Sequence, residues 1–170
     1  VAWLQDALRA RRAGARPGIL AKIETTSAIR TLPEILVQGI GQSTFGVIIA
    51  RGDLAVEIGF EHLAEVQEEL LWVCEAAHVP VVWATQVLET LTKTGWPSRA
   101  EITDAAMAER AEIVMLNKGA FQHEAIVALD DVLRRMEGHA EKKRPTLRAL
   151  TAWRDLLPGT AHPIPPVAHS

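Results

Sequence analysis

The sequence lacks several features, and each absence excludes a class of protein. Cys74 is the only cysteine among the 170 residues, which excludes an internal disulfide framework, and we expect its thiol to be buried. No apolar run reaches the roughly 20 residues of a membrane span, and no signal peptide is evident. The net charge of −3 provides no strong attraction to nucleic acid. We therefore expect a cytoplasmic protein that binds neither membranes nor nucleic acid.

Familiar ligand-binding motifs are missing as well. The sequence contains no Gly-rich Walker loop for phosphates and no Gly-x-Gly-x-x-Gly fingerprint for dinucleotides. Its six histidines lack the spacing of a zinc site.

What the sequence does contain is a regular alternation of strands and helices. Apolar residues make up 48% of the chain, which is enough for a folded core. Apolar runs predict strands at Ile19–Ile23, Phe45–Ala50, 80–85 and Ile113–Leu116. Amphipathic segments predict helices at 1–12, after a cap at Ser27, at 61–77, at 98–108 and between Gly119 and Met136.

The ends of these strands recur at intervals of about 30 residues, as in consecutive βα units. They fall at Glu24, Asp53, Thr85 and Asn117. This period predicts an α/β fold with a parallel sheet and right-handed helical crossovers. We expect one folded domain over residues 1–157 and a disordered tail over 158–170, where Pro, Gly and His dominate. Because the chain begins with Val1 rather than Met, we also expect it to be a piece of a longer protein.

A charged pair marks the end of the first strand. Alternation along a strand places Lys22 and Glu24 on one face, at the carboxyl end where parallel α/β folds build their active sites. The carboxylate could bind a metal ion and the ammonium an anionic substrate. An ordinary ion pair in a barrel mouth is the alternative.

A second acidic group follows the next strand. Asp53 is expected beside Glu24, and two carboxylates completed by substrate oxygens suit Mg²⁺ or Mn²⁺. Gly52 lets the backbone approach a ligand closely, whereas a tight strand–helix turn capped by Asp53 is the alternative. Thr85 could relay a proton through its hydroxyl, or simply cap the helix that follows. We expect helix-surface or interface positions for Glu89, Arg99, Glu101 and Asp104.

Together these segments resemble the pyruvate kinase family from about Val1 to Gly138. The resemblance rests on the order and spacing of Ala21-Lys22-Ile23-Glu24, Ala50-Arg51-Gly52-Asp53-Leu54, Ala84-Thr85-Gln86 and Arg99-Ala100-Glu101. It implies the last four βα units of a TIM (β/α)8 barrel, that is, a C-terminal half-barrel of four strands.

The resemblance implies a reaction in which phosphoenolpyruvate and ADP give pyruvate and ATP. Lys22 would steady the charge on the transferring phosphoryl group. Glu24 and Asp53 would bind the divalent metal, Mg²⁺ or Mn²⁺. Positioning and charge stabilisation supply most of the catalysis in such reactions.

The resemblance also implies contacts with the three-carbon substrate. Arg51 and Gly52 would lie against the carboxylate of phosphoenolpyruvate, next to Asp53. Thr85 would lie beside the enolate carbon and take part in its protonation.

Two departures from the family pattern bear on the expected activity. Asn117-Lys118-Gly119 stands where typical members have Ser-Gly-Glu-Thr, and we expect the usual regulatory C-terminal domain to be absent. The first half of the barrel, the nucleotide-covering lid and the K⁺ site of the full enzyme are expected outside this chain. We therefore expect a homo-oligomer, or complementation by a first half-barrel, and leave open whether the 170 residues turn over substrate alone.

Two other functions remain open at this point. A metal-dependent aldolase or lyase of the phosphoenolpyruvate/pyruvate barrel class would also use Glu24 and Asp53, although it does not require Lys22 or the Arg51-Gly52 pair. A non-catalytic half-barrel that only binds metal or partners is the third possibility, which the missing Ser-Gly-Glu-Thr element favours slightly.

Overall fold

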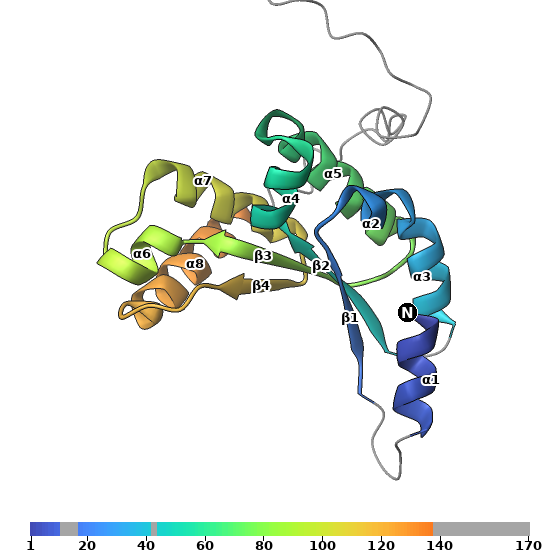
Figure 1. Ribbon diagram of the computed structural model, residues 1–170. Helices are drawn as coiled ribbons and strands as arrows, with labels where there is room; N and C mark the ends of the chain where they lie inside the picture. The colour runs from blue at the N-terminus through green and yellow to red at the C-terminus, as the bar shows by residue number, and fades with distance from the viewer. Residues whose placement is uncertain (11–16, 42–43, 138–170) are drawn as a thin grey trace, which may run out of the picture.

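The computed structural model describes residues 1–10, 17–41 and 44–137 (Figure 1). Within these ranges a single parallel sheet has the strand order β1-β2-β3-β4. Its strands are β1 (Ile19–Ile23), β2 (Phe45–Ala50), β3 (Val81–Val87) and β4 (Ile113–Leu116). Each strand therefore pairs with its neighbour in sequence, as in a stretch of an α/β barrel. The structure thus confirms the predicted fold class, a partial parallel α/β barrel.

Helices separate the strands and frame their carboxyl ends. In Figure 1, α2, α4 and α6 directly follow the carboxyl ends of β1, β2 and β3. The helices are α1 (Ala2–Ala10), α2 (Thr26–Arg30), α3 (Leu32–Ile40), α4 (Arg51–Ile58), α5 (Phe60–Ala76), α6 (Glu89–Thr94), α7 (Arg99–Met107) and α8 (Gln122–Met136), with a 3-10 turn at Ala108–Arg110. None of these described helices is long and apolar enough to cross a membrane. The predicted end of the first helix at residue 12, the domain end at 157 and the tail at 158–170 lie outside the described residues.

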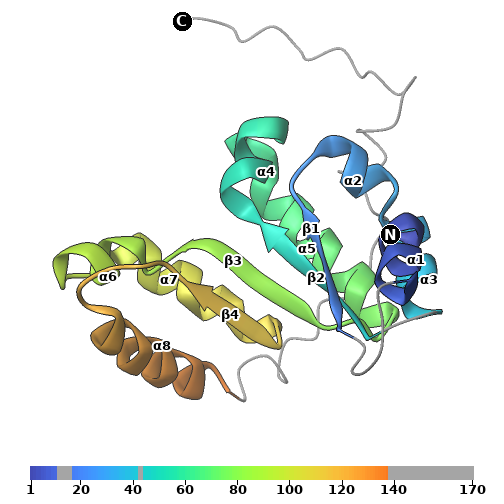
Figure 2. The ribbon, with the colours of Figure 1, turned by 60° about the horizontal axis from the view of Figure 1, so that its bottom comes forward.

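The core lies between the sheet and the longer helices. Figure 2 shows α5 and α7 behind the strands. Ile23, Ile49 and Trp83 from the sheet are buried together with Leu70 from α5. Full burial of one such side chain stabilises the fold by about 1.5–3 kcal/mol. This packing fixes the strands relative to one another, and with them the row of residues at their carboxyl ends.

The opposite face of the sheet is partly open. Lys22, Ile48, Val82 and Ile113 are in register across the four strands and form one row on this face. Strand alternation places Leu20 on the same face as Lys22, and it is 52% exposed.

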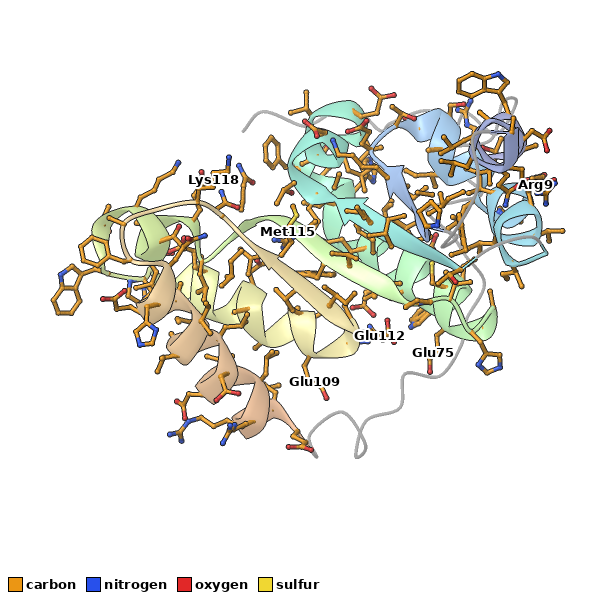
Figure 3. All side chains as sticks on the ribbon, turned by 90° about the horizontal axis from the view of Figure 1, so that it is seen from below. Arg9, Glu75, Glu109, Glu112, Met115 and Lys118 are labelled. Carbon is orange, nitrogen blue, oxygen red and sulfur yellow. The ribbon has the colours of Figure 1, made fainter. Side chains whose placement is uncertain are left out.

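The β4 edge of this face is equally exposed. Ile113 is 50% and Met115 is 45% exposed. Figure 3 shows Met115 between Lys118 and Glu112, which flank the two ends of β4. In a closed barrel, side chains from opposite strands fill this space. The exposure is what a sheet of four strands, rather than eight, would show.

Two local features differ from the sequence prediction. The predicted cap at Ser27 is wrong, because Thr25 Oγ1 accepts the N–H of Ala28 at 3.2 Å while Ser27 lies inside α2. Helix α4 follows β2 directly, as in the alternative of a tight strand–helix turn, but Asp53 lies in its first turn rather than capping it. The chain therefore turns into a helix directly after β2, and Asp53 projects from that helix rather than from the strand end.

The third strand contains an irregularity at the predicted site. Strand β3 runs on past Thr85, and the five residues of β3 from Trp83 to Val87 lie opposite the three residues of β4 from Val114 to Leu116. Thr85 and Gln86 adopt positive φ angles of 67° and 56°. Because non-glycine residues rarely occupy this region, such conformations persist only where surrounding contacts hold them. The segment is therefore a bulge whose geometry the rest of the fold imposes.

Candidate active site

Three charged side chains converge at the carboxyl ends of β1 and β2. The ammonium of Lys22 donates a hydrogen bond to Glu24 Oε2 and another to Asp53 Oδ2, the latter at 3.1 Å. Lys22 and Glu24 come from β1 and the residue just beyond it, whereas Asp53 comes from α4. The structure thus brings together all three residues that the sequence predicts as a charged site.

The local fold explains this convergence. Lys22 pairs in register with Ile48, so β2 continues for only two residues beyond that level before α4 begins. Asp53 then lies in the first turn of α4, where the helix dipole stabilises a negative charge. The parallel register therefore places this carboxylate level with the end of β1.

The electrostatics follow from these contacts. Hydrogen bonds to Glu24 and then to Asp53 raise the pKa of the Lys22 ammonium, so it is fully charged at neutral pH. The hydrogen bond from Lys22, followed by its positive charge, lowers the pKa of Asp53. The site is consequently one fixed cation held between two acidic side chains at the protein surface.

The donor set suits a hard divalent cation. Oxygens of Glu24 and Asp53 both point at one positive centre, the Lys22 nitrogen, which shows that the two carboxylates can address a single cation. Mg²⁺ and Mn²⁺ prefer such carboxylate oxygens. Among the described residues, no cluster of three or more acidic, His or Cys side chains could hold a metal. Water or substrate oxygens could supply the remaining ligands beside Glu24 and Asp53.

A second set of predicted residues meets beside this charged group. The backbone N–H of Gly52 donates to Thr85 Oγ1 at 2.8 Å, which joins the first turn of α4 to the bulge in β3. A Cβ added at Gly52 would meet Thr85 Oγ1 at 3.5 Å, an ordinary contact distance. Packing would thus admit a small side chain at this position.

Arg51 does not join the surface group. Its side chain is only 8% exposed, and the guanidinium binds the carbonyls of Ala84 and Thr85 and the carboxylate of Asp104. The resemblance to the family assigns the Arg51-Gly52 turn to the substrate carboxylate. In this structure only the Gly52 part of that turn lies toward the site, because Arg51 points into the protein.

Sequence reasoning missed two residues near the site. Asp104 was expected at a helix surface or interface, yet it pairs with buried Arg51. Asn117 Oδ1 accepts the N–H of Gln86 at 3.2 Å, so the strand end that departs from the family pattern supports the bulge. A buried arginine after an apolar strand does signal that an acidic partner exists, but no local pattern identifies one 53 residues away.

Fold and site together define a class of protein. Parallel βα units with a lysine and two carboxylates at their carboxyl ends are typical of α/β-barrel enzymes that bind a metal and an anionic substrate. Comparison with known proteins narrows this class. A family profile described as "Pyruvate kinase, barrel domain" matches residues 6–126, and the chain belongs to the pyruvate kinase family.

Individual relatives agree with this assignment. A pyruvate kinase of Agrobacterium vitis is 36% identical over 152 residues, which cover 85% of this chain and 30% of the relative. A pyruvate kinase of Thermotoga maritima is 35% identical over 156 residues, 86% of this chain and 32% of the relative. The chain therefore spans less than a third of the length of these relatives.

The fold is similar to a solved structure as well. The crystal structure of a pyruvate kinase from Cryptosporidium parvum matches with a TM-score of 0.64 and 32% sequence identity. The match covers 77% of this chain and 28% of that one. The likeness in fold thus extends over most of the chain and agrees with the family assignment.

Proposed function

We propose that the chain forms part of a pyruvate kinase-type phosphotransferase that converts phosphoenolpyruvate and ADP into pyruvate and ATP with a divalent metal. The observation that carries this proposal is the convergence of Lys22, Glu24 and Asp53 at one point. Family membership supports the same class of reaction. We also propose a cytoplasmic location, in keeping with the glycolytic character of the reaction.

Lys22 and the two carboxylates would have different electrostatic roles in the reaction. The Lys22 ammonium, which now donates two hydrogen bonds to the carboxylates, would stabilise negative charge on the transferring phosphoryl group. Glu24 and Asp53 would hold Mg²⁺ or Mn²⁺, which supplies Lewis acidity and positive charge at the reacting oxygens. Binding of a metal by both carboxylates requires the Lys22 nitrogen to give up part of its present contacts.

Thr85 and Gly52 would handle the three-carbon substrate. Because Thr85 Oγ1 accepts the Gly52 N–H, the hydrogen of the hydroxyl itself is not committed to that contact. This proton could be directed to the substrate or to a bound water. Gly52 also lies in the first turn of α4, where the positive end of the helix dipole would favour the substrate carboxylate. These two residues would thus orient the substrate and hold a proton at the Thr85 oxygen.

The proposal extends to partners that would complete the reaction. Because the chain spans less than a third of its relatives, we propose the full reaction for an assembly in which the barrel is complete. The assembly would be a homo-oligomer or a pairing with a first half-barrel. It would supply the remaining nucleotide contacts and any K⁺ site.

A coupled assay for pyruvate tests the proposed reaction. Pyruvate formation from phosphoenolpyruvate should require both ADP and Mg²⁺, and Glu24→Gln should reduce it strongly. Asp131→Asn is the matched control, because Asp131 pairs with Arg135 on the exposed side of α8. Pyruvate formation that is independent of ADP would instead indicate lyase chemistry and would overturn the proposal.

A further inference from the structure

The bulge in β3 needs an explanation for its stability. Thr85 and Gln86 both lie in the left-handed region, and Leu88 follows with a φ of 47°. None of these three residues is glycine, so the backbone alone does not favour the left-handed conformation of the bulge. The bulge determines where the Thr85 hydroxyl lies relative to Gly52. Whatever holds the bulge therefore holds this part of the candidate site.

Arg51 contacts the bulge from within the protein. Its Nε donates to the carbonyl of Ala84 at 3.0 Å, and its Nη2 donates to the carbonyl of Thr85 at 2.5 Å. The two acceptors are consecutive backbone groups at the point where φ turns positive. A planar guanidinium can bind two neighbouring carbonyls at once, whereas an ammonium cannot match this geometry.

The guanidinium is itself fixed on its remaining sides. Nη1 binds Asp104 of α7, and the Arg51 Cζ lies 4.5 Å from the centroid of the Trp83 ring. Trp83 is fully buried directly before the bulge. Arg51 therefore has a partner in each direction, and its side chain has no freedom to turn toward a ligand.

Backbone contacts hold the bulge from the side of the site. Gly52, the neighbour of Arg51, donates its N–H to Thr85 Oγ1, and Gln86 donates its N–H to Asn117 Oδ1. The first turn of α4 thus binds the bulge twice. The Arg51 side chain holds its carbonyls, and the Gly52 N–H holds the Thr85 hydroxyl.

We propose that Arg51 is a positioning residue that sets the β3 bulge, and through it the relative placement of the Thr85 hydroxyl and the Gly52 N–H. Asp104 and Trp83 hold Arg51 in the orientation that this requires. The inference deepens the proposed function and rests on it for its catalytic meaning. The positioning itself is a statement about geometry and can be tested without turnover.

A purely structural role is the competing explanation. In that case the Arg51–Asp104 pair would merely join α7 to α4, and its loss would lower global stability without changing the bulge. Two amide protons distinguish the cases. The Gly52 N–H is in the first turn of α4 and has no intrahelical acceptor, so its protection depends on Thr85 Oγ1. The Gln86 N–H depends likewise on Asn117 Oδ1.

Residue-resolved hydrogen exchange, measured by NMR on the full 170-residue chain, provides the test. Arg51→Lys keeps the charge but loses the two-carbonyl geometry, and Asp104→Asn removes only the partner of Arg51. We expect exchange of the Gly52 and Gln86 amides to speed up about tenfold in Arg51→Lys and by a smaller factor in Asp104→Asn. Arg110→Lys is the matched control, because it alters the Arg110–Glu68 pair and should leave both amides unchanged.

Each result of the exchange experiment decides for or against the positioning role of Arg51. If both amides exchange at the wild-type rate in Arg51→Lys and Asp104→Asn, Arg51 does not position the bulge. If Arg51→Lys fails to fold, Asp104→Asn still decides. Equal acceleration in the Arg110→Lys control would indicate global loosening and would also overturn the proposal.

Steady-state kinetics in the catalytically competent assembly add the functional readout. Misplacing Thr85 and Gly52 should raise the KM for phosphoenolpyruvate roughly tenfold or more in Arg51→Lys while leaving the KM for ADP unchanged. A purely structural defect lowers only the concentration of active enzyme and therefore kcat. If wild-type protein forms no pyruvate, the proposed function fails, whereas the exchange experiment still tests the positioning.

Discussion

The ammonium nitrogen of Lys22 lies 3.1 Å from Oδ2 of Asp53, a carboxylate contributed by the next βα unit. The same nitrogen binds Glu24. Lys22 therefore occupies the space between the two proposed metal ligands. A metal ion bound by both carboxylates has to replace at least part of this contact, so cation binding and the position of Lys22 are linked.

Metal binding should depend on both carboxylates. Asp53→Asn keeps the size of the side chain but removes its charge, and a hard cation prefers charged oxygen ligands. We expect Mn²⁺ affinity to fall by at least about 10- to 100-fold, the loss that changing even an outer-shell partner of a metal ligand typically causes. Titration calorimetry with Mn²⁺ measures this, and Asp131→Asn on α8 serves as the control. Unchanged affinity in Asp53→Asn would remove this residue from the metal site.

Loss of the lysine should separate catalysis from metal binding. Lys22→Met removes the cation that the proposal places at the phosphoryl group, and turnover of the competent assembly should fall by about 10²- to 10³-fold or more. Mn²⁺ affinity should not decrease, because the ammonium that now occupies both carboxylates is gone. Lys93→Met is the control, since Lys93 pairs with Glu89 on α6. Near-wild-type turnover in Lys22→Met would contradict the assigned role.

The single thiol should be inert in the folded chain. Burial, followed by the negative charge of Glu112, raises the pKa of Cys74 to about 12. The thiolate is the reactive form, and only about one molecule in ten thousand carries it at pH 8, so the reaction should be slow. A disulfide reagent such as DTNB should therefore label the native chain very slowly and the urea-unfolded chain rapidly. Rapid native labelling would show that Cys74 is accessible.

The raised pKa of Cys74 also predicts how the free energy of unfolding changes with pH. The folded state disfavours the thiolate, so this group does not affect stability at pH values below the pKa of an unfolded thiol, about 8.5. As the pH rises above that value, the unfolded chain loses its proton first and the free energy of unfolding should fall. Urea unfolding at increasing alkaline pH, compared with Cys74→Ala, measures this contribution.

The start of α7 should depend on its capping box. Ser98 Oγ accepts the N–H of Glu101 at 3.2 Å, and Glu101 accepts the N–H of Ser98 at 2.9 Å and that of Thr90 as well. Ser98→Ala should lower the free energy of unfolding by about 1 kcal/mol. Thr103→Ala on the same helix removes an exposed side-chain contact and should cost less. Equal losses in the free energy of unfolding for Ser98→Ala and Thr103→Ala would show that the capping box does not stabilise the start of α7 beyond an ordinary surface contact.

The same box predicts a pH dependence. Burial tends to raise the pKa of Glu101, but the hydrogen bonds from Ser98 and Thr90 outweigh it and the pKa is lowered from its ordinary value of 4.5. A lowered pKa means that the stabilisation is present above the unfolded value and is lost as the pH falls through the folded one. The stability difference between wild type and Glu101→Gln should therefore shrink below pH 4.5.

The grouping of the charged residues could be predicted from the sequence. Parallel strands end at the same edge of a sheet, so evenly spaced strands bring Lys22, Glu24 and Asp53 together whatever the details of the turns. The sequence left a tight strand–helix turn at Asp53 as an alternative but did not predict that the helix begins at Arg51. The segment Arg51–Ile58 contains a glycine and two acidic residues, so its local sequence does not favour a helix strongly. Burial of its apolar residues in the folded protein stabilises the helix instead.

The direction of Arg51 and the bulge at Thr85 were beyond sequence reasoning for a different reason. Both depend on partners remote in the chain, namely Asp104 on α7 and Asn117 after β4. A period-two strand pattern assumes that every residue stays in register. Such a pattern cannot reveal the register shift between β3 and β4 after Trp83.

The open face of the sheet leads to a prediction about association. Within the described residues, β1 and β4 each have one neighbouring strand, so each has one edge without a backbone partner in the sheet. Leu20 and Met115 stand on these two strands and are about half exposed. Unpaired edges beside exposed apolar side chains mark a surface that associates. We therefore predict that the 170-residue chain does not persist as a compact monomer.

Size exclusion with light scattering tests this association, and one substitution gives it a control. Met115→Lys places a charge on the β4 edge, where edge strands commonly carry lysine against pairing, and should shift the chain toward smaller species. Val127→Lys changes an exposed apolar residue of α8 instead and should leave the association unchanged. Two copies that complete each other through the open face would protect β1 and β4 amides from exchange, because both edges would become paired. A monodisperse monomer at micromolar concentration with cooperative unfolding would contradict the prediction, since the exposed face would then be stable in water without a partner.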